Sequence, residues 1–303
     1  MENTNLLNHV KANFDQVSDS AGPYITPLPD LILIRHFSPT EFESVIYEPI
    51  VCLILQGKKE TTIHERTIEI GPGESLLISH DVTVSARTTQ ASKELPYIAL
   101  VVKIDLGMLR SLYESIESFD TNEDEASSFA FDIIDDDISE TLERYLKLTD
   151  NPQGAKILGP LILKELHYRL LMAPQGAMLR HLMLRNSHAS NIYKAIKIIR
   201  ENFRQPLAIP EVAKYAGMGI SSFHTHFKSI TGTTPLQFQK ELRLIEAKQM
   251  LISGRHSVSS AAFEVGYESP TQFSREYKRE FGHSPATDLM ESDNFDSSVL
   301  QAG

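Results

Sequence analysis

The sequence predicts an α+β protein of two domains: an N-terminal β-barrel or sandwich followed by helices, and a C-terminal domain built only of helices. Three observations support this prediction. Short apolar and β-branched runs separated by turn residues fill residues 20–105, apolar residues then change to helical spacing, and the last third of the chain contains one helical pattern twice. With 303 residues, the chain is long enough for two ordinary domains, each with its own core.

The β-rich prediction depends on turn signals, such as Gly71-Pro72-Gly73, that separate the apolar runs. The runs lie at 31–35, 44–57, 60–64, 67–70, 75–79, 82–86 and 97–104. After Asp105 the apolar residues follow a helical period, apart from an acidic segment at 121–128 that we predict to be a loop. One predicted helix has a broad apolar stripe, which we expect to pack within its domain and against a second subunit. The stripe consists of Ile157, Leu158, Leu161, Ile162, Leu166, Leu170 and Leu171.

The composition restricts the compartment. Apolar residues make up 41% of the chain and charged residues 23%, as in ordinary globular proteins. The single cysteine, Cys52, excludes a disulfide framework within the chain and is typical of a reducing compartment. The first residues lack the basic and apolar parts of a secretory signal, and the longest apolar runs are too short to span a membrane. We therefore expect a cytoplasmic protein with no membrane partner.

The charges are unevenly distributed along the chain. A net charge of −11 argues, taken alone, against nucleic-acid binding. However, residues 1–188 contain 16 Lys and Arg against 28 Asp and Glu, whereas residues 189–290 contain 13 against 9. Residues 291–303 add three acidic residues, and we predict this acidic tail to be disordered. The basic excess favours a polyanionic partner for the C-terminal third, although random scatter of charge could also produce it.

We place the domain boundary in a segment of mixed pattern that contains a proline and a glycine. The predicted N-terminal domain covers residues 1–173, the linker 174–190 and the C-terminal domain 191–290. The C-terminal domain repeats a unit of helix, glycine-containing turn and helix, and from Phe223 and Phe273 onward the two copies match at an offset of 50 residues. The first unit is placed at about 208–231, the linking helix at 236–253 and the second unit at about 258–281.

Such units suit DNA, because the second helix of a helix-turn-helix packs one face on the first helix and offers the other to the major groove. The linking helix would span about 27 Å, which can hold two recognition helices roughly one DNA turn apart. Short polar side chains reach base edges, and an arginine can form a bidentate pair with guanine. Lysines near the end of the helix suit phosphates.

Residues 191–290 also contain a signature at defined spacing. It consists of Pro235, Phe238, Arg243, Ala247, Leu251, Ala261, Gly266, Tyr267, Ser269, Phe273, Tyr277, Lys278, Gly282 and Pro285. On this signature the C-terminal third resembles the AraC/XylS family of bacterial transcription regulators. The stretches TPLPDLILIR, YEPIVCLILQGKK and IGPGESLLIS resemble the cupin-like regulatory domain of a subgroup of that family.

The resemblance implies a sequence-specific regulator of transcription, acting as an activator, that binds double-stranded DNA and responds to an unknown small-molecule inducer. It also implies a homodimer and contact with RNA polymerase. The residues implied to contact DNA are Ser221, Ser222, His224, Thr225 and Lys228 in the first unit and Thr271, Gln272, Ser274, Arg275 and Lys278 in the second. Because the first set lacks a large hydrogen-bond donor such as arginine or tryptophan, we expect the second unit to discriminate more between DNA sequences. Arg243 is expected to form a structural ion pair rather than to read bases.

The candidate ligand-binding residues of the N-terminal domain are Arg35, Cys52, Lys58 and His80. Cys52 lies in an apolar run, so it can be either a small buried hydrophobe or a sensor thiol that faces a pocket. Strand alternation puts it on one face with Ile50 and Ile54, and the sequence leaves open which face of the strand points inward.

The alternative function is a cupin-type metal-dependent enzyme with an accessory helical domain. The β-rich part contains only the widely spaced His36, His64 and His80 as imidazole ligands. His224 and His226 would point to different faces of a helix, which makes a shared metal ion difficult. We therefore predict no metal, no cofactor and no catalytic residue, and we expect the protein not to be an enzyme.

Overall fold

A computed structural model describes residues 4–15, 21–63, 66–116 and 127–289. The predicted acidic tail, most of the predicted acidic loop, and His64 lie outside these ranges. The chain divides into two compact units, one of residues 1–42 and 47–190 and the other of residues 43–46 and 191–303. The α+β class with a helical C-terminal part is thereby confirmed. In the described part of the chain, no helix combines the length and the apolar character needed to cross a bilayer.

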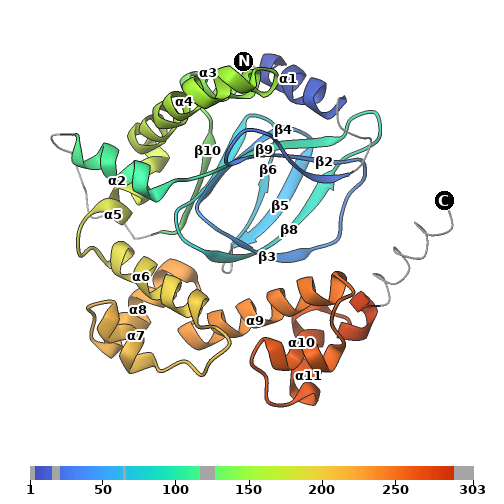
Figure 1. The fold of residues 1–303 in the computed structure, drawn as a ribbon, viewed down its shortest axis with the longest axis vertical. Coiled ribbons are helices and arrows are strands. Elements are labelled where there is room, and N and C mark those ends of the chain that lie inside the picture. The colour runs from blue at the N-terminus through green and yellow to red at the C-terminus, as the bar shows by residue number, and fades with distance from the viewer. Residues whose placement is uncertain (1–3, 16–20, 64–65, 117–126, 290–303) are drawn as a thin grey trace. The chain divides into compact units, whose positions relative to one another are not determined.

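The strands form two sheets, which belong to the first unit except for residues 43–46 (Figure 1). The six-stranded sheet has the order β1 (Gly22–Ile25), β2 (Leu31–His36), β9 (Tyr97–Lys103), β4 (Ile50–Gln56), β7 (Glu74–Ile78) and β10 (Phe129–Ile133). The four-stranded sheet has the order β3 (Glu43–Tyr47), β8 (Val82–Gln90), β5 (Lys58–Ile63) and β6 (Arg66–Ile70). Among the described residues the strands remain in two sheets and do not close into a barrel, which was one of the two predicted arrangements.

The chain passes from one sheet to the other between β4 and β5. The register of β4 against β9 shifts between Ile54 and Gln56, and Gly57 follows with a φ of 75°. A β-bulge redirects a strand, and glycine adopts positive φ without steric cost. A Cβ on Gly57 would lie 2.4 Å from the Gln90 carbonyl oxygen, so the crossing also requires the absence of a side chain. The redirected chain therefore pairs with β8 in the second sheet.

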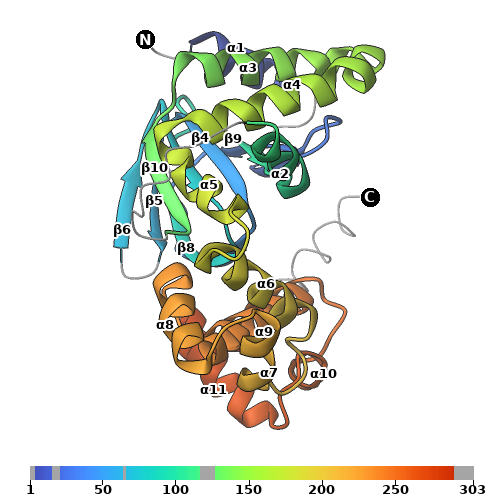
Figure 2. The ribbon, with the colours of Figure 1, turned by 90° about the vertical axis from the view of Figure 1, so that its left-hand side faces the viewer.

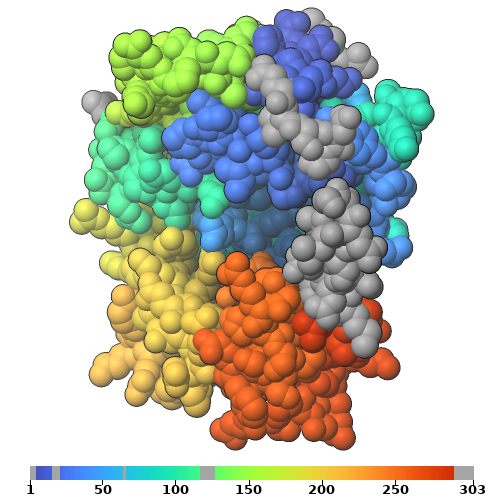
Figure 3. Space-filling view, turned by 45° about the vertical axis from the view of Figure 1, so that its right-hand side comes forward, coloured from blue at the N-terminus to red at the C-terminus, as the bar shows by residue number. Residues whose placement is uncertain are grey.

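Three helices, α1 (Thr4–Asp15), α3 (Asp136–Leu146) and α4 (Pro152–Met172), lie side by side over the six-stranded sheet (Figure 1). In the space-filling view, the dark blue surface of α1 adjoins the yellow-green surface of α3 and α4 (Figure 3). The sequence did not predict α1, although Leu6 and Val10 are buried on its inner face. Further along, α2 (Leu106–Glu114) contacts both α4 and α5 (Ala177–Met183). The segment predicted to be a linker thus contains a helix with a buried apolar face.

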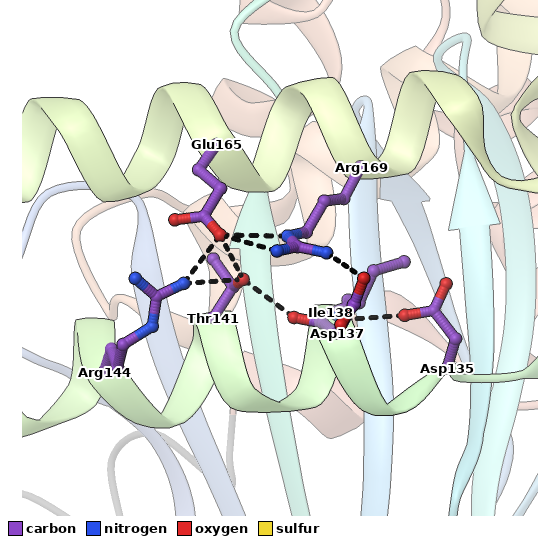
Figure 4. A network of polar contacts seen from close by, with 7 residues as sticks. All are labelled: Asp135, Asp137, Ile138, Thr141, Arg144, Glu165 and Arg169. Atoms are coloured by element: carbon purple, nitrogen blue, oxygen red, sulfur yellow. Dashed lines mark hydrogen bonds and ion pairs between the residues drawn. The ribbon is translucent and has the colours of Figure 1, made fainter.

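A polar network joins α3 to α4 on their exposed side (Figure 4). The Glu165 carboxylate of α4 accepts hydrogen bonds from Arg144 (Nη2 to Oε1, 2.7 Å) and Arg169 (Nε to Oε1, 2.9 Å). Arg169 also pairs with Asp137 at the start of α3. The hydrogen bond from Arg144 is the largest influence that lowers the pKa of the Glu165 carboxyl. Because these groups are partly exposed, each ion pair contributes little to the stability of the unit.

The second unit contains the predicted repeat (Figures 1 and 2). After α6 (His188–Glu201), the first helix-turn-helix is α7 (Ile209–Tyr215) with α8 (Ile220–Thr231), and the second is α10 (Val258–Glu264) with α11 (Pro270–Phe281). The linking helix α9 (Pro235–Ile252) lies between the two pairs and contacts α8, α10 and α11. These bounds lie within one residue of the ranges read from the sequence.

Candidate nucleic-acid interface

Each helix-turn-helix turns at a glycine with a left-handed backbone. Gly217 follows α7 with a φ of 69°, and Gly266 follows α10 with a φ of 90°. Only glycine enters this region without strain, so these positions end the first helix and start the turn. At Gly266 the fit is closer, since a Cβ would lie 2.1 Å from the Arg204 carbonyl oxygen. Pro270 and the Ser269 cap then start α11, where the Ser269 hydroxyl accepts a hydrogen bond from the Gln272 amide.

The aromatic face of each second helix is core. Phe223 and Phe227 of α8 are fully buried, as are Phe273 and Tyr277 of α11. Phe281 is only partly buried at the edge of the same cluster. This packing fixes the rotation of each helix about its axis, and the opposite face is thereby turned outward.

The side chains proposed to contact DNA lie on these outward faces. The exposed ones are Ser221, Ser222, His224, Thr225, Lys228, Thr271, Gln272, Arg275 and Lys278, and Ser274 is partly buried. Two hydroxyls bond within their own helix, since Thr225 donates to the Ser221 carbonyl (3.1 Å) and Ser274 to the Pro270 carbonyl (2.9 Å). An inward-facing Arg275 or His224 would have contradicted the DNA-binding hypothesis, and neither points inward.

Sequence reasoning missed Glu276, which organises part of α11. Its carboxylate accepts hydrogen bonds from Gln272 (Nε2 to Oε1, 3.1 Å) and from Tyr267 (Oη to Oε2, 2.9 Å). Burial, and then this hydrogen bond, raise the pKa of the Tyr267 hydroxyl far above its usual value, so it remains a donor. With Lys240 and Arg243, these side chains line a groove of about 460 Å³. The spacing of four residues between Gln272 and Glu276 was the signal in the sequence.

Arg243 has a structural role, but its partners differ from the expected ion pair. Its guanidinium donates to three backbone carbonyls: Phe203 (2.7 Å), Gly266 (2.9 Å) and Gln205 (3.1 Å). A planar fork of donors can reach several acceptors at fixed angles, which an ammonium group cannot do. The residue therefore connects the segment before α7 to the turn of the second helix-turn-helix.

Three of the four ligand candidates in the first unit lie away from the face between the sheets. The Arg35 guanidinium packs over the rings of Phe14 (4.5 Å) and Phe37 (4.8 Å). Lys58 is exposed and pairs with Glu69 at 2.7 Å. Arg35 and Lys58 therefore do not point into the space between the two sheets.

His80 is the third of these, and it is 0% exposed. Its Nε2 lies 3.0 Å from the Ala189 carbonyl oxygen, and its Nδ1 lies 2.8 Å from the Ser79 hydroxyl. Because a carbonyl oxygen only accepts, Nε2 carries the proton in this contact, and Nδ1 can then accept a hydrogen bond from the Ser79 hydroxyl. Burial lowers the pKa of His80 to about 4, against the opposing effect of the Ala189 carbonyl.

Cys52 is the candidate that faces the other sheet. It is buried, burial raises the pKa of its thiol, and the Lys59 ammonium of the four-stranded sheet lies close enough to oppose that shift in part. The two sheets face each other here, since His36 of β2 hydrogen-bonds Thr88 of β8 (Nδ1 to Oγ1, 2.7 Å). Sequence reasoning considered Lys58 and missed Lys59, although alternation along β5 allows only one of the two to point inward.

Metal ligands do not gather in the described ranges. No group of three or more His, Cys, Asp or Glu side chains that could hold a metal ion is found there. His36 and His80 make separate contacts, one to Thr88 and the other to Ser79 and Ala189.

Two protein-family models match the chain. Residues 27–178 match the model described as the N-terminus of AraC-type transcriptional regulators, and residues 212–289 match a helix-turn-helix domain. The protein belongs to the AraC/XylS family of transcription regulators. In this AraC/XylS member, the two matches cover the β-rich unit and the repeated helices separately.

Curated relatives of this AraC/XylS protein are also regulators. The virulence regulon transcriptional activator VirF of Yersinia enterocolitica is 28% identical over 153 residues, which cover 49% of this chain and 55% of VirF. The raffinose operon regulator RafR of Pediococcus pentosaceus is 30% identical over 150 residues, 50% of this chain and 52% of RafR. These matches span about half the length of each relative. ExsA of Pseudomonas aeruginosa is 24% identical over 83% of this chain and 90% of its own length.

Solved structures of ToxT from Vibrio cholerae share the fold. A ligand-free ToxT variant matches with a TM-score of 0.57 at 11% identity, over 86% of this chain and 97% of that one. ToxT with a bound unsaturated fatty acid matches with the same TM-score at 10% identity, over 90% of this chain and 97% of that one. These matches extend over both units of the chain and show a shared fold.

Proposed function

We propose that this protein is a sequence-specific DNA-binding transcription regulator, acting as an activator in the cytoplasm, whose β-rich unit responds to a small molecule. The observation that supports it most directly is the pair of matched helix-turn-helix units joined by α9, each with a buried aromatic face and an exposed polar face. That arrangement fits two successive segments of major groove. No comparable observation favours the metal-dependent enzyme.

DNA binding is tested by footprinting and gel shift on the sequences upstream of the neighbouring genes. Arg275→Ala should weaken binding to a protected site about 5- to 150-fold, which corresponds to about 1–3 kcal/mol for a lost bidentate base contact. It should also relax preference at one base pair. Lys156→Ala is the matched control, because Lys156 is an exposed residue of α4 in the other unit and its loss removes the same charge. Equal effects of the two variants would contradict specific recognition by α11.

The two units are proposed to contribute unequally. His224→Ala in α8 should reduce discrimination between the cognate site and a scrambled site less than Arg275→Ala does, because α8 presents mostly short hydroxyl side chains. A larger loss of discrimination in His224→Ala would reverse this assignment.

A homodimer is proposed through the exposed face of α4. The predicted apolar stripe divides into two faces: Leu166, Leu170 and Leu171 are buried within the unit, whereas Ile157 and Leu161 are 65% and 62% exposed. Tyr168 and Met172 continue the exposed face at helical spacing, together with Leu158. A second copy of α4, related by a two-fold axis, would cover this face with an identical one.

The oligomeric state is measured by analytical ultracentrifugation over a range of concentrations. Replacing Ile157 and Leu161 by serine should raise the dimer dissociation constant at least about tenfold, since each buried aliphatic side chain contributes roughly 1.5–3 kcal/mol. Replacing the exposed Phe263 of α10 by serine is the control for loss of an exposed apolar side chain. A parent protein that stays monomeric at all concentrations, or a dimer that the double variant leaves intact, would exclude this interface.

Activation and response to a ligand are tested together. Purified protein, a template with the protected site and RNA polymerase should give more transcript than polymerase alone, and a small molecule should change that ratio by shifting the population of a DNA-binding conformation. The fatty acid bound in ToxT, a protein of the same fold, supports the ligand part of the proposal. A lower transcript level on addition of the protein would make it a repressor.

A further inference from the structure

A lysine side chain is buried between the two sheets of the first unit. Lys59 of β5 is 7% exposed. It alternates along β5 with Thr61 and Ile63, which are also buried, while the residues between them are partly exposed. Removing an ammonium group from water is costly unless the charge is paired, so a buried lysine normally has a carboxylate beside it.

The ammonium group of Lys59 has one polar partner among the described residues, and that partner is neutral. Nζ donates to the Tyr47 hydroxyl at 2.6 Å and lies 4.9 Å from the centre of the Tyr47 ring. No ion pair forms with any carboxylate in the described ranges. An ammonium has three donors, so two of them find no acceptor in this part of the protein.

Other polar atoms on the same inner faces are buried without a partner. The Tyr97 hydroxyl of β9 and the Thr61 hydroxyl of β5 have no hydrogen bond, although Tyr97 is 2% exposed and Thr61 0%. Tyr97 lies within electrostatic reach of both Cys52 and Tyr47, and Cys52 lies within reach of Lys59. Buried hydroxyls normally have partners, so two such atoms on the same inner faces as an unpaired charge indicate a place where a ligand supplies the acceptor.

We propose that the inner faces of the two sheets bind an organic carboxylate, whose oxygens accept hydrogen bonds from the Lys59 ammonium and the Tyr97 hydroxyl. The inference rests on the proposed ligand-responsive function and names the chemical class of the ligand. Lys59 supplies the charge, and Tyr47 holds its side chain in place. Cys52, Ala99 and Val101 supply an apolar surface on the opposite sheet for the remainder of the molecule.

A carboxylate fits this set of donors better than other ligand classes do. A neutral alcohol or sugar would leave the ammonium charge unpaired. A phosphate dianion would bring two charges and three acceptor oxygens to a site that has one cation. A single negative charge on two oxygens matches one ammonium and one hydroxyl in both charge and number.

The first test needs no knowledge of the ligand. If Lys59 is an unpaired charge held for a ligand, Lys59→Met should stabilise the ligand-free protein and raise its unfolding midpoint by about 2–4 °C, because the apolar stem remains and the buried charge is removed. Lys58→Met is the matched control, since Lys58 is the exposed neighbour and pairs with Glu69. It should leave the midpoint within about 1 °C of the parent value. A lower midpoint for Lys59→Met would mean that the lysine is a structural element, and would overturn the proposal.

The second test uses the full-length protein without DNA. Titration calorimetry with benzoate, 3-phenylpropanoate, hexanoate and octanoate is compared with titration of the corresponding primary amides. At least one acid should bind ten or more times more tightly than its amide. Lys59→Met should abolish that preference, and Lys58→Met should retain it. Acids that bind no better than amides to the parent protein would overturn the proposal even if Lys59→Met did not fold. Because DNA is absent, this outcome is distinct from failure of the gel shifts, which would count against the regulatory function instead.

Discussion

The stability of the first unit should depend on pH through His80, and the structure gives the size of the effect. His80 is fully buried and its pKa is about 4, whereas a histidine in an unfolded chain titrates near 6.5. The folded pKa lies below the unfolded one, so unfolding takes up a proton at acidic pH. The stability contribution of the neutral imidazole is complete above about pH 6.5 and is lost as the pH falls towards 4. The difference between these two pKa values lowers the free energy of unfolding by about 2 kcal/mol between pH 8 and pH 5.

The perturbation is His80→Gln, which keeps an amide donor of similar reach for the Ala189 carbonyl but does not titrate. The assay is urea unfolding at pH 8, 6.5 and 5, followed by far-ultraviolet circular dichroism because the chain has no tryptophan. His80→Gln should lose about 2 kcal/mol less than the parent between pH 8 and pH 5, whatever its stability at pH 8. His188→Gln removes an exposed histidine instead and controls for loss of an imidazole. The reasoning is refuted if the parent and His80→Gln lose equal stability over this range.

Three further predictions concern the helical unit. Gly266→Ala should lower the free energy of unfolding by at least about 2 kcal/mol in thermal unfolding, because the new Cβ meets the Arg204 carbonyl. Gly217→Ala is the control and should cost about 1 kcal/mol, because the space around Gly217 is open. Equal costs for the two variants would show that the close approach at Gly266 is unimportant. Arg243→Lys should lower the free energy of unfolding by about 1.5–3 kcal/mol, because an ammonium cannot donate to all three carbonyls. An unchanged melting temperature would argue against a structural role for these three hydrogen bonds. Lys278→Ala should reduce the slope of log affinity against log salt by about 1, measured by fluorescence anisotropy on cognate DNA, and an unaltered slope would remove it from the phosphate contacts.

The helical unit was readable from the sequence because its determinants are local. Gly266, Pro270 and the aromatic residues at helical spacing each specify a turn, a helix start or a buried face within a few residues. The two copies at an offset of 50 then confirmed each other. The partners of Arg243 could not be read in this way, because backbone carbonyls distant in sequence carry no residue-level signal.

The β-rich unit was less predictable because its faces depend on long-range register. Alternation alone could not say which side of β4 faces the second sheet, so Cys52 remained ambiguous. The shift between Ile54 and Gln56 changes the alternation just before β5, and therefore Lys59 rather than Lys58 points inward. The helix α5 was missed because Pro174 and Gly176 read as breakers, whereas they form a short turn that leads into the helix.

The carbonyls bound by Arg243 have a consequence for the promoter. The Arg243 guanidinium binds both the segment before α7 and the turn after α10, so we expect the separation of the two helix-turn-helix units to change little from one DNA site to another. Inserting a single base pair between the two half-sites would displace one of them by about 3.4 Å and rotate it by roughly 34° around the duplex. With the two helix-turn-helix units held at one separation, we expect DNA affinity to fall less on a base substitution within a half-site than on a change in spacer length.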